Sequence, residues 1–351
     1  MNAKPFLLTF LLPSLVLAGA DAADRGKHDR ERERKLEELV VTASPLQPAG
    51  EEVVQPVTVL AGEELDAKKA ATLGETVARE VGVQSSFFGA GVGRPIIRGQ
   101  EGARVQVLEG GLGSLDISTV SADHAVSIEP FLADQIEILK GPATLLYGSG
   151  AVGGAVNVVD GRIPEALSEQ PTGRAELRGS SGADERTGMF RLDGSAGDWA
   201  LHADAFRRDA DDYEIPGFAE SQGAHESGEE EQEAAEERGA FGVLPNSAFT
   251  TEGGAFGASW IGEHGVRGAA ISTYRRDYGI PGHAHEENEG EAEEEEAVRI
   301  DLEQVRFDLK GAWLEPFDGA ESLRLRLGRN DYEHTEIEGG QIGTQFDNDG
   351  V

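Results

Sequence analysis

The fold is decided by residues 129–159, which read EPFLADQIEILKGPATLLYGSGAVGGAVNVV. Within this stretch, Ile136–Leu139 and Ala155–Val159 are runs of aliphatic and β-branched residues, which predict two strands. Glycine and proline residues lie between the runs, first at Lys140–Pro142 and then from Gly148 to Gly154. These residues favour tight turns, because glycine adopts positive φ angles readily and proline interrupts strand pairing. The stretch therefore predicts two strands with compact connections.

The glycine-rich segment Gly148–Gly153 also fits the spacing G-x-G-x-x-G of dinucleotide-binding loops. Such a loop must be followed by a helix, whose N-terminal amides hold the pyrophosphate. Here Val156, Val158 and Val159 follow, and β-branched residues in this arrangement favour a strand. The pattern therefore indicates a structural turn and argues against a nucleotide site.

Five motifs, in order along the chain, resemble the plug domain of TonB-dependent outer-membrane receptors. They are PIIRG at Pro95–Gly99, RVQVLEG at Arg104–Gly110, QIEILKGP at Gln135–Pro142, LLYGSGAVGG at Leu145–Gly154 and VNVV at Val156–Val159. Several ordered motifs are far more specific than one glycine pattern. The resemblance implies an α+β plug domain at residues 48–165, followed by antiparallel transmembrane β-barrel strands at residues 172–351.

The N-terminus has the features of a secretory signal peptide at residues 1–22. Lys4 supplies the positive charge, Phe6–Leu17 the apolar region, and the small residues from Ala18 to Ala22 an A-x-A cleavage site. The apolar run is shorter than the roughly 20 residues that a membrane helix needs. We therefore expect export to the bacterial outer membrane, with residues 23–47 as a periplasmic linker.

The composition restricts the partners. The 351-residue chain has a formal net charge of -34, which argues against nucleic acid and permits attraction of cations. It has no cysteine, so a metal site must use histidine, aspartate and glutamate.

Within the expected plug, Val53–Leu60 predicts a strand and Gly62–Arg79 a mostly helical segment with Leu65, Leu73 and Val77 apolar. Ile96–Arg98 and Arg104–Leu108 are expected to form paired strands.

From about residue 172 the sequence alternates between apolar and polar residues, as a membrane barrel requires. In the expected sixth strand, for example, Val305, Phe307 and Leu309 alternate with Arg306 and Asp308. The expected strands are residues 173–179, 187–194, 199–207, 249–261, 266–276, 298–314 and 323–327, with an eighth near residue 351. Plugged transporters have about 22 strands, so we expect an N-terminal fragment whose barrel is incomplete.

The lengths of the connections agree with this topology. The connections at residues 196–198, 262–265 and 316–320 are short and fall on one side, which would be the periplasmic side. The long connections, residues 209–245 and 278–297, both fall on the other side and would be external loops.

The segment that precedes the expected plug resembles a TonB box. Glu38, Leu39, Val40, Val41, Thr42 and Ala43 form a short β-branched run that ends at Ser44–Pro45. In the family, such a segment pairs as an added strand with TonB of the TonB–ExbB–ExbD complex. The alternative is an ordinary strand.

Two expected external loops begin with similar motifs, DYEIPG at Asp212–Gly217 and DYGIPG at Asp277–Gly282. Each continues into histidine and glutamate residues: His225 in the first, and His283, His285, Glu286 and Glu287 in the second. Histidine-rich tracts with carboxylates are typical of metal binding and suit zinc and its first-row neighbours. The alternative is a solvated acidic loop.

These loops resemble the zinc-uptake, ZnuD-like branch of the family, in which an Asp-His pair on a plug loop helps form the zinc site. Asp123 and His124 occupy the matching place. Two ligands leave a tetrahedral zinc ion two short, so barrel residues must contribute, and His334 and Glu336 are candidates. The resemblance implies a monomeric importer of a metal ion, most closely zinc, embedded in outer-membrane lipid and without catalytic activity or a catalytic cofactor.

Two alternatives remain open. One is a receptor for an iron chelate, haem or cobalamin, although such cargo favours loops rich in aromatic and arginine residues. The other is a surface metal-binding protein without a transport role.

Overall fold

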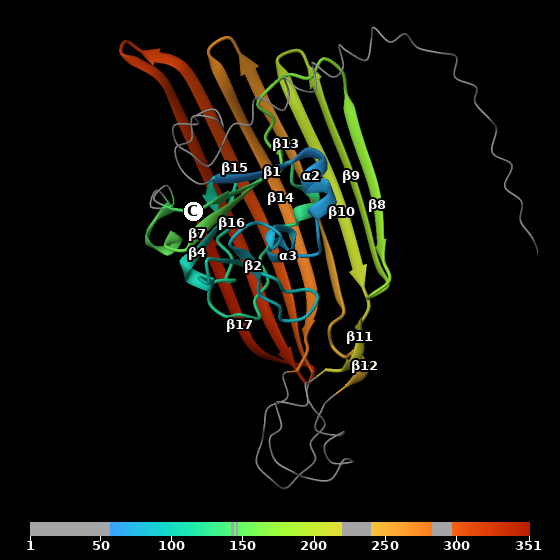
Figure 1. Cartoon of the computed structure of the whole chain (residues 1–351). Coiled ribbons are helices and arrows are strands. Elements are labelled where there is room, and N and C mark those ends of the chain that lie inside the picture. Colours follow the sequence, from blue (N-terminus) through green and yellow to red (C-terminus); the bar gives the residue numbers. More distant parts are fainter. Residues whose placement is uncertain (1–56, 142–143, 145–146, 220–239, 283–296) are drawn as a thin grey trace, which may run out of the picture.

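The computed structural model describes residues 57–219, 240–282 and 297–351, apart from residues 142, 143, 145 and 146. A small mixed domain, residues 57–165, lies on the concave side of a large sheet of long strands (Figure 1). We call the small domain the plug and the large sheet the wall. In the described ranges, no helix is long and apolar enough to cross a membrane.

The plug is built on a five-stranded sheet in the order β1-β6-β7-β4-β5. Its strands are β1 (Val57–Ala61), β4 (Val105–Glu109), β5 (Leu112–Gly113), β6 (Gln135–Leu139) and β7 (Gly154–Val159). The antiparallel pairing of β6 with β7 confirms the strand pair predicted from residues 129–159. β7 also pairs in parallel with β4. The neighbouring strands β6 and β7 are almost wholly buried, which fits their mostly apolar sequences, and the two buried polar residues Glu137 and Asn157 hydrogen-bond to each other at 3.0 Å.

Glycine and short helices shape the connections of the plug. Gly148 has φ 90°, and the chain then forms a 3-10 turn, η5 (Ser149–Ala151), before entering β7. A strand thus follows the G-x-G-x-x-G pattern, as predicted, and the helix that a dinucleotide loop needs is not formed there. Two more 3-10 turns in the described plug are η2 (Gly102–Arg104) and η3 (Pro130–Leu132).

The segment predicted to be helical forms two helices, α2 (Gly62–Lys68) and α3 (Leu73–Val77), separated at residues 69–72. The Thr72 side chain caps α3 by accepting a hydrogen bond from the Glu75 amide at 3.3 Å. The three apolar residues of the prediction, Leu65, Leu73 and Val77, are buried in the plug core.

The pairing predicted for residues 96–98 and 104–108 is wrong. β3 (Pro95–Ile97) pairs with β2 (Val83–Ser85) in a separate two-stranded sheet, whereas β4 joins the five-stranded sheet. β3 and β4 are separated by a turn and η2, and β4 instead finds its partner in β7, about 50 residues later.

The wall is an eight-stranded antiparallel sheet in the order β17-β16-β15-β14-β13-β10-β9-β8. Its strands are β8 (Thr172–Ser180), β9 (Glu185–Ala196), β10 (Trp199–Ala210), β13 (Phe249–Gly262), β14 (Gly265–Ile280), β15 (Val298–Phe317), β16 (Ala320–Glu338) and β17 (Gln341–Gly350). β8 and β17 are its two edges, so the sheet is unclosed. This arrangement confirms the predicted fold class, a plug followed by part of an antiparallel barrel.

The predicted alternation separates the two faces of the wall. On β15, Phe307 and Leu309 are exposed on the face away from the plug, whereas Arg306 points inward and is buried. Trp313 and Glu303 bound the apolar stretch of β15 on its outer face and lie ten residues apart in sequence. At about 3.3 Å per residue and a tilt of about 40°, this stretch is about 25 Å tall, the height of the apolar band of a membrane barrel.

The two ends of the wall differ. The short hairpin turns of β9–β10, β13–β14 and β15–β16 share one end, which we call the short-turn end (Figure 1). At the opposite end, the long-loop end, β11 (Tyr213–Phe218) and β12 (Phe241–Leu244) form a separate two-stranded sheet. This hairpin lies within the segment that the sequence predicted only as a long loop.

Partly buried ion pairs and hydrogen bonds join the plug to the wall. Arg162 of the plug pairs with Glu109 and Asp160 of the plug and donates a hydrogen bond to Ser272 Oγ of β14 at 2.7 Å. Arg306 of β15 donates to the Gly113 carbonyl of the plug at 3.0 Å. Burial raises the pKa of the Glu109 carboxyl, whereas for Asp160 burial is outweighed by Arg162, which lowers its pKa. The plug is therefore held by charge as well as by packing.

Candidate metal centre

His124 is presented by a plug loop, residues 114–129, that its own side chains hold in shape. The Asp116 carboxylate accepts hydrogen bonds from the Ser118 hydroxyl at 2.6 Å and from the amide and hydroxyl of Ser127, both at 3.1 Å. Arg94 donates to the Ser121 carbonyl at 2.7 Å. Burial lowers the pKa of the Arg94 guanidinium, although nearby acidic residues oppose this shift. The loop is therefore a fixed support for His124.

Tyr278 of β14 attaches this loop to the wall. Its hydroxyl donates to the Asp123 carbonyl at 3.2 Å and accepts from the Ala125 amide at 3.0 Å, so it grips the backbone on both sides of His124. Tyr278 itself is fully buried. The wall thus determines where the imidazole of His124 lies.

Two residues of β16 complete a cluster with His124. His334 and Glu336 are two positions apart, so both side chains point toward the plug. His124 Nε2 lies 3.1 Å from Glu336 Oε1, and His334 Nε2 lies 3.7 Å from the same oxygen. The two imidazole ring centres are 4.5 Å apart. Within the described residues these three are the group with metal-ligand geometry, their ligand atoms lying within 4.8 Å of one another.

Both ring nitrogens of His124 face oxygen acceptors. Nδ1 is 3.2 Å from the Ile117 carbonyl, and Nε2 is 3.1 Å from the Glu336 carboxylate. A neutral imidazole carries one N–H group, so in either tautomer one lone pair lies against an oxygen atom. A metal ion between Nε2 and the carboxylate, with the proton on Nδ1, would remove this conflict.

His334 is the second candidate ligand. Its Nδ1 lies 3.2 Å from the Tyr332 hydroxyl, whereas its Nε2 is buried without a hydrogen-bond partner in the described structure. A histidine ligand commonly uses one nitrogen for the metal and the other for a hydrogen bond that orients the ring. Phe346 of β17 packs its ring edge-on against both imidazoles and shields them.

The donor set fits zinc. Two ligand atoms, each about 2.05 Å from a tetrahedral ion, lie about 3.3 Å apart. The observed separations of 3.1 Å and 3.7 Å bracket this value. Two imidazoles and one carboxylate also form a zinc site with one open position, which suits binding and release better than a closed cage does.

Of the residues predicted as metal ligands, His124 and His334 are brought together. Glu336, a secondary candidate, joins them. Asp123 is adjacent, but its carboxylate is outside the group of three and accepts a hydrogen bond from the Ser121 hydroxyl. The following predicted residues lie outside the described residues: His225, His283, His285, Glu286 and Glu287, and the predicted TonB-binding segment Glu38–Ala43.

The plug lies on the inner face of an unclosed antiparallel wall (Figure 1). Residues 49–155 match the family model described as TonB-dependent Receptor Plug Domain. The chain therefore carries the plug domain that its motifs resemble.

Comparisons with individual proteins agree with this match to the plug-domain family. The chain is 29% identical over 194 residues, 55% of its length, to the vitamin B12 transporter BtuB of Photobacterium profundum, and spans 29% of that relative. The solved structure of the copper transporter OprC has a TM-score of 0.60 and 16% identity, covering 80% of this chain and 38% of that one. The FrpB iron transporter from Neisseria meningitidis (F3-3 variant) has a TM-score of 0.59 and 13% identity, covering 80% and 41%.

At these identities the structural likeness shows the fold alone. The proteins found are transporters and receptors, which agrees with the prediction that the chain is not an enzyme.

Proposed function

We propose that this chain belongs to an outer-membrane receptor that imports a divalent metal ion, zinc, in a TonB-dependent manner. The observation that supports this most is the cluster of His124, His334 and Glu336, where a plug residue meets two wall residues around a buried imidazole nitrogen that has no hydrogen bond within the part of the chain that the structure describes. Imidazole and carboxylate together suit zinc and its first-row neighbours.

The position of the cluster suggests how uptake proceeds. The metal would bind both the plug and the wall, so a movement of the plug separates His124 from His334 and Glu336 and breaks the site. We propose that TonB pulls on Glu38–Ala43 and supplies this movement. The histidines and glutamates of the two long loops, His225, His283, His285, Glu286 and Glu287, would raise the local metal concentration outside. Asp123 would turn from Ser121 to become the fourth ligand.

The remaining parts of this scheme follow from the proposed domain organisation. Residues 1–22 would direct export, residues 23–47 would reach TonB, and residues 48–165 would plug the barrel that begins at residue 172. The receptor would act as a monomer in outer-membrane lipid.

A second candidate is a receptor for cobalamin or for an iron chelate or haem. It is favoured by the similarity to a vitamin B12 transporter over 194 residues. This candidate does not explain why two buried imidazoles and a carboxylate meet between the plug and the wall.

Isothermal titration of the complete receptor that contains this chain tests the proposal. We expect one equivalent of zinc to bind, His124→Ala to weaken its affinity at least about 100-fold, and Asp123→Ala to weaken it less, because the site retains three ligands. Cobalt, nickel and copper titrations rank the metals. Unchanged zinc affinity in His124→Ala would refute the site, and tight binding of cobalamin without zinc binding would favour the second candidate.

A further inference from the structure

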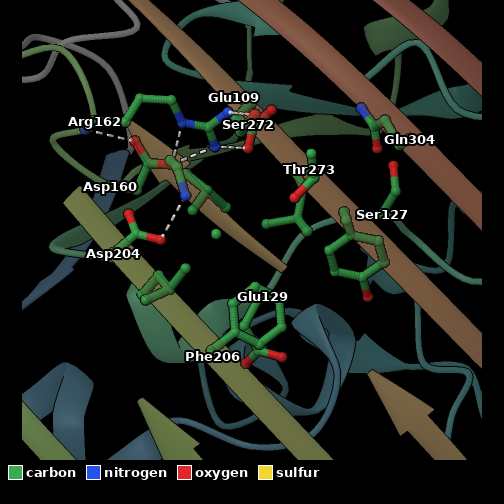
Figure 2. A pocket seen from close by; sticks show the side chains of 16 residues that line it. Glu109, Ser127, Glu129, Asp160, Arg162, Asp204, Phe206, Ser272, Thr273 and Gln304 are labelled. Carbon is green, nitrogen blue, oxygen red and sulfur yellow. Dashed lines mark hydrogen bonds and ion pairs between the residues drawn. The ribbon is translucent and has the colours of Figure 1, made fainter. Parts of the chain in front are cut away.

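A small cavity of about 40 Å³ lies between the plug and the wall. Its plug side includes Glu109, Ser127, Glu129, Asp160 and Arg162, and its wall side comes from β10, β13, β14 and β15 (Figure 2). The wall residues include Asp204, Phe206, Ser272, Thr273, Tyr274 and Gln304. None of the three residues of the candidate metal centre lines it.

The cavity follows the metal centre in the direction of the short-turn end. Leu302 of β15 pairs with His334, and the next inward position of β15, Gln304, pairs with Tyr332. Gln304 lines the cavity. The cavity therefore begins at the next residue of β15 whose side chain points toward the plug, two residues past the level of the metal centre. A buried cluster that contains Phe131, Leu302 and Tyr332 packs at this level. An ion that left the centre toward the short-turn end would therefore meet this cavity next.

The charge of the lining favours a cation. Four carboxylates, those of Glu109, Glu129, Asp160 and Asp204, face one guanidinium, that of Arg162. The formal sum over the lining residues is four negative charges and one positive charge, or -3. Two guanidiniums behind the lining offset part of this charge, since Arg208 lies 2.9 Å from Glu129 and Arg306 lies 3.4 Å from Glu109. The Ala255 amide donates to Asp204 at 3.0 Å. The carboxylates therefore have partners already, and they contribute a weak negative field more than free ligand atoms.

One oxygen in the lining has no partner. Gln304 is 5% exposed, and its Oε1 is buried without a hydrogen bond in the described structure. Its orientation is fixed by Asn330, whose Nδ2 donates to the Leu115 carbonyl at 3.3 Å. Asn330 Oδ1 must then accept from Gln304 Nε2, at 2.7 Å, which leaves Gln304 Oε1 as the free atom.

The free amide oxygen is accompanied by hydroxyl groups. Figure 2 shows Gln304 and Ser127 on one side of the cavity, with the Arg162 ion pairs on the opposite side. Thr273 lies between them in this view. Neutral oxygen atoms in a negative field suit a hard cation that retains part of its water shell. A buried carbonyl oxygen that lacks a hydrogen bond is uncommon, and a bound ion or its water would satisfy it.

We propose that this cavity is a second cation site, which holds a partly hydrated divalent ion through Gln304 Oε1 after the ion leaves the centre of His124, His334 and Glu336. The inference rests on the proposed metal import. The two sites differ in chemistry: imidazole nitrogen captures the ion first, and neutral oxygen and water hold it afterwards, more weakly. A weaker second site lets the ion continue instead of remaining bound.

Manganese is the probe for this site, because Mn²⁺ prefers oxygen ligands and is counted directly by electron paramagnetic resonance. The experiment uses the receptor that contains this chain, with residues 220–239 and 283–296 deleted so that the acidic runs do not bind Mn²⁺. The sample is first saturated with zinc. We expect one equivalent of Mn²⁺ to bind. Gln304→Leu should weaken it at least tenfold, and Gln304→Glu should tighten it severalfold, because a charged oxygen replaces a neutral one.

Gln345→Leu is the matched control, since Gln345 lies on the outer face of β17 and is exposed. It should leave Mn²⁺ binding unchanged. Thermal unfolding and electrophoretic mobility verify that each variant is folded. Absence of Mn²⁺ binding in the parent receptor, or equal binding in folded Gln304→Leu, would overturn the proposal and leave a cavity that holds water only. Zinc titration of the same samples tests the first centre separately, so failure of one site is distinguishable from failure of the other.

Discussion

Two histidines on the inner face of the wall differ in what surrounds them. His202 of β10 and His334 of β16 are both buried and both point toward the plug. The ring of His202 lies between two carboxylates, with Nδ1 2.7 Å from Asp193 and Nε2 2.6 Å from Asp204. His334 has the Tyr332 hydroxyl on one nitrogen and, in the described structure, no hydrogen-bond partner on the other.

This difference extends to the surroundings of each histidine. Near His202, toward the short-turn end, charged groups are paired, and Arg162 neutralises several carboxylates at once. Near His334 the imidazole of His124 approaches, and Nε2 of His334 has no hydrogen-bond partner among the described residues. A buried polar atom without a partner costs about 1–3 kcal/mol, and at His334 a ligand held with His124 and Glu336 would satisfy it. The paired charges near His202 instead indicate a contact that attaches the plug to the wall.

The largest effect is expected where the charges are fully paired. Arg162→Gln leaves the partly buried Asp160 carboxylate without its cation and leaves Glu109 and Asp308 with Arg306 alone, so the receptor should lose about 3 kcal/mol of unfolding free energy. Denaturant unfolding, followed by the fluorescence of the wall tryptophans, measures this loss. An undiminished unfolding free energy would show that the cluster does not hold the plug.

The loss of unfolding free energy in Arg162→Gln should depend on pH in one direction. In the parent protein Arg162 outweighs burial and lowers the pKa of Asp160, so this pairing stabilises the fold above the usual carboxyl pKa and is lost as the pH falls through the lowered value. Without Arg162 burial dominates and raises that pKa. The carboxyl then takes up a proton at higher pH, so the difference from the parent protein should shrink between about pH 7 and pH 4.

The comparison of the two histidines provides the next test. His334→Ala removes a proposed zinc ligand and should raise the zinc Kd at least about 100-fold. His202→Ala removes an equally buried imidazole of the wall but leaves the zinc ligands in place, so it should lower thermal stability and leave the zinc Kd within about threefold. Isothermal titration and calorimetry measure both. If both variants lose zinc binding equally, the distinction between a free and a paired imidazole has no functional meaning.

Local sequence patterns predicted the elements but not all of their partners. The apolar runs at residues 136–139 and 155–159, and the alternation along β15, were sufficient to predict strands. The partner of β3 was predicted wrongly as residues 104–108, because a three-residue strand pairs equally well with any nearby edge, and tertiary packing selects β2. The β11–β12 hairpin lies at the ends of a Glu-rich stretch, where the alternation is too short to see.

The candidate site shows the same limit. The sequence predicted His124 through a family resemblance and His334 as one of several candidates. It gave no reason to prefer Glu336 to Asp123, because their order around the imidazole depends on a contact between residues 212 positions apart. No sequence pattern indicated that Gln304 belongs to a site, because its free oxygen results from the orientation of Asn330.

The smallest expected effect concerns the support of the site, and the repeated loop motif provides its control. Tyr278 and Tyr213 occupy the same position in the two Tyr-x-Ile-Pro-Gly motifs, but Tyr278 is buried and Tyr213 is 40% exposed. Tyr278→Phe removes the hydroxyl that holds the backbone beside His124, which should cost about 1 kcal/mol and weaken zinc binding about fivefold to tenfold. Tyr213→Phe should leave the zinc Kd unchanged. Equal Kd values for the two variants and the parent receptor would mean that Asp116 and Arg94 alone fix the loop, and that the wall contributes ligands to the centre without positioning the plug side of it.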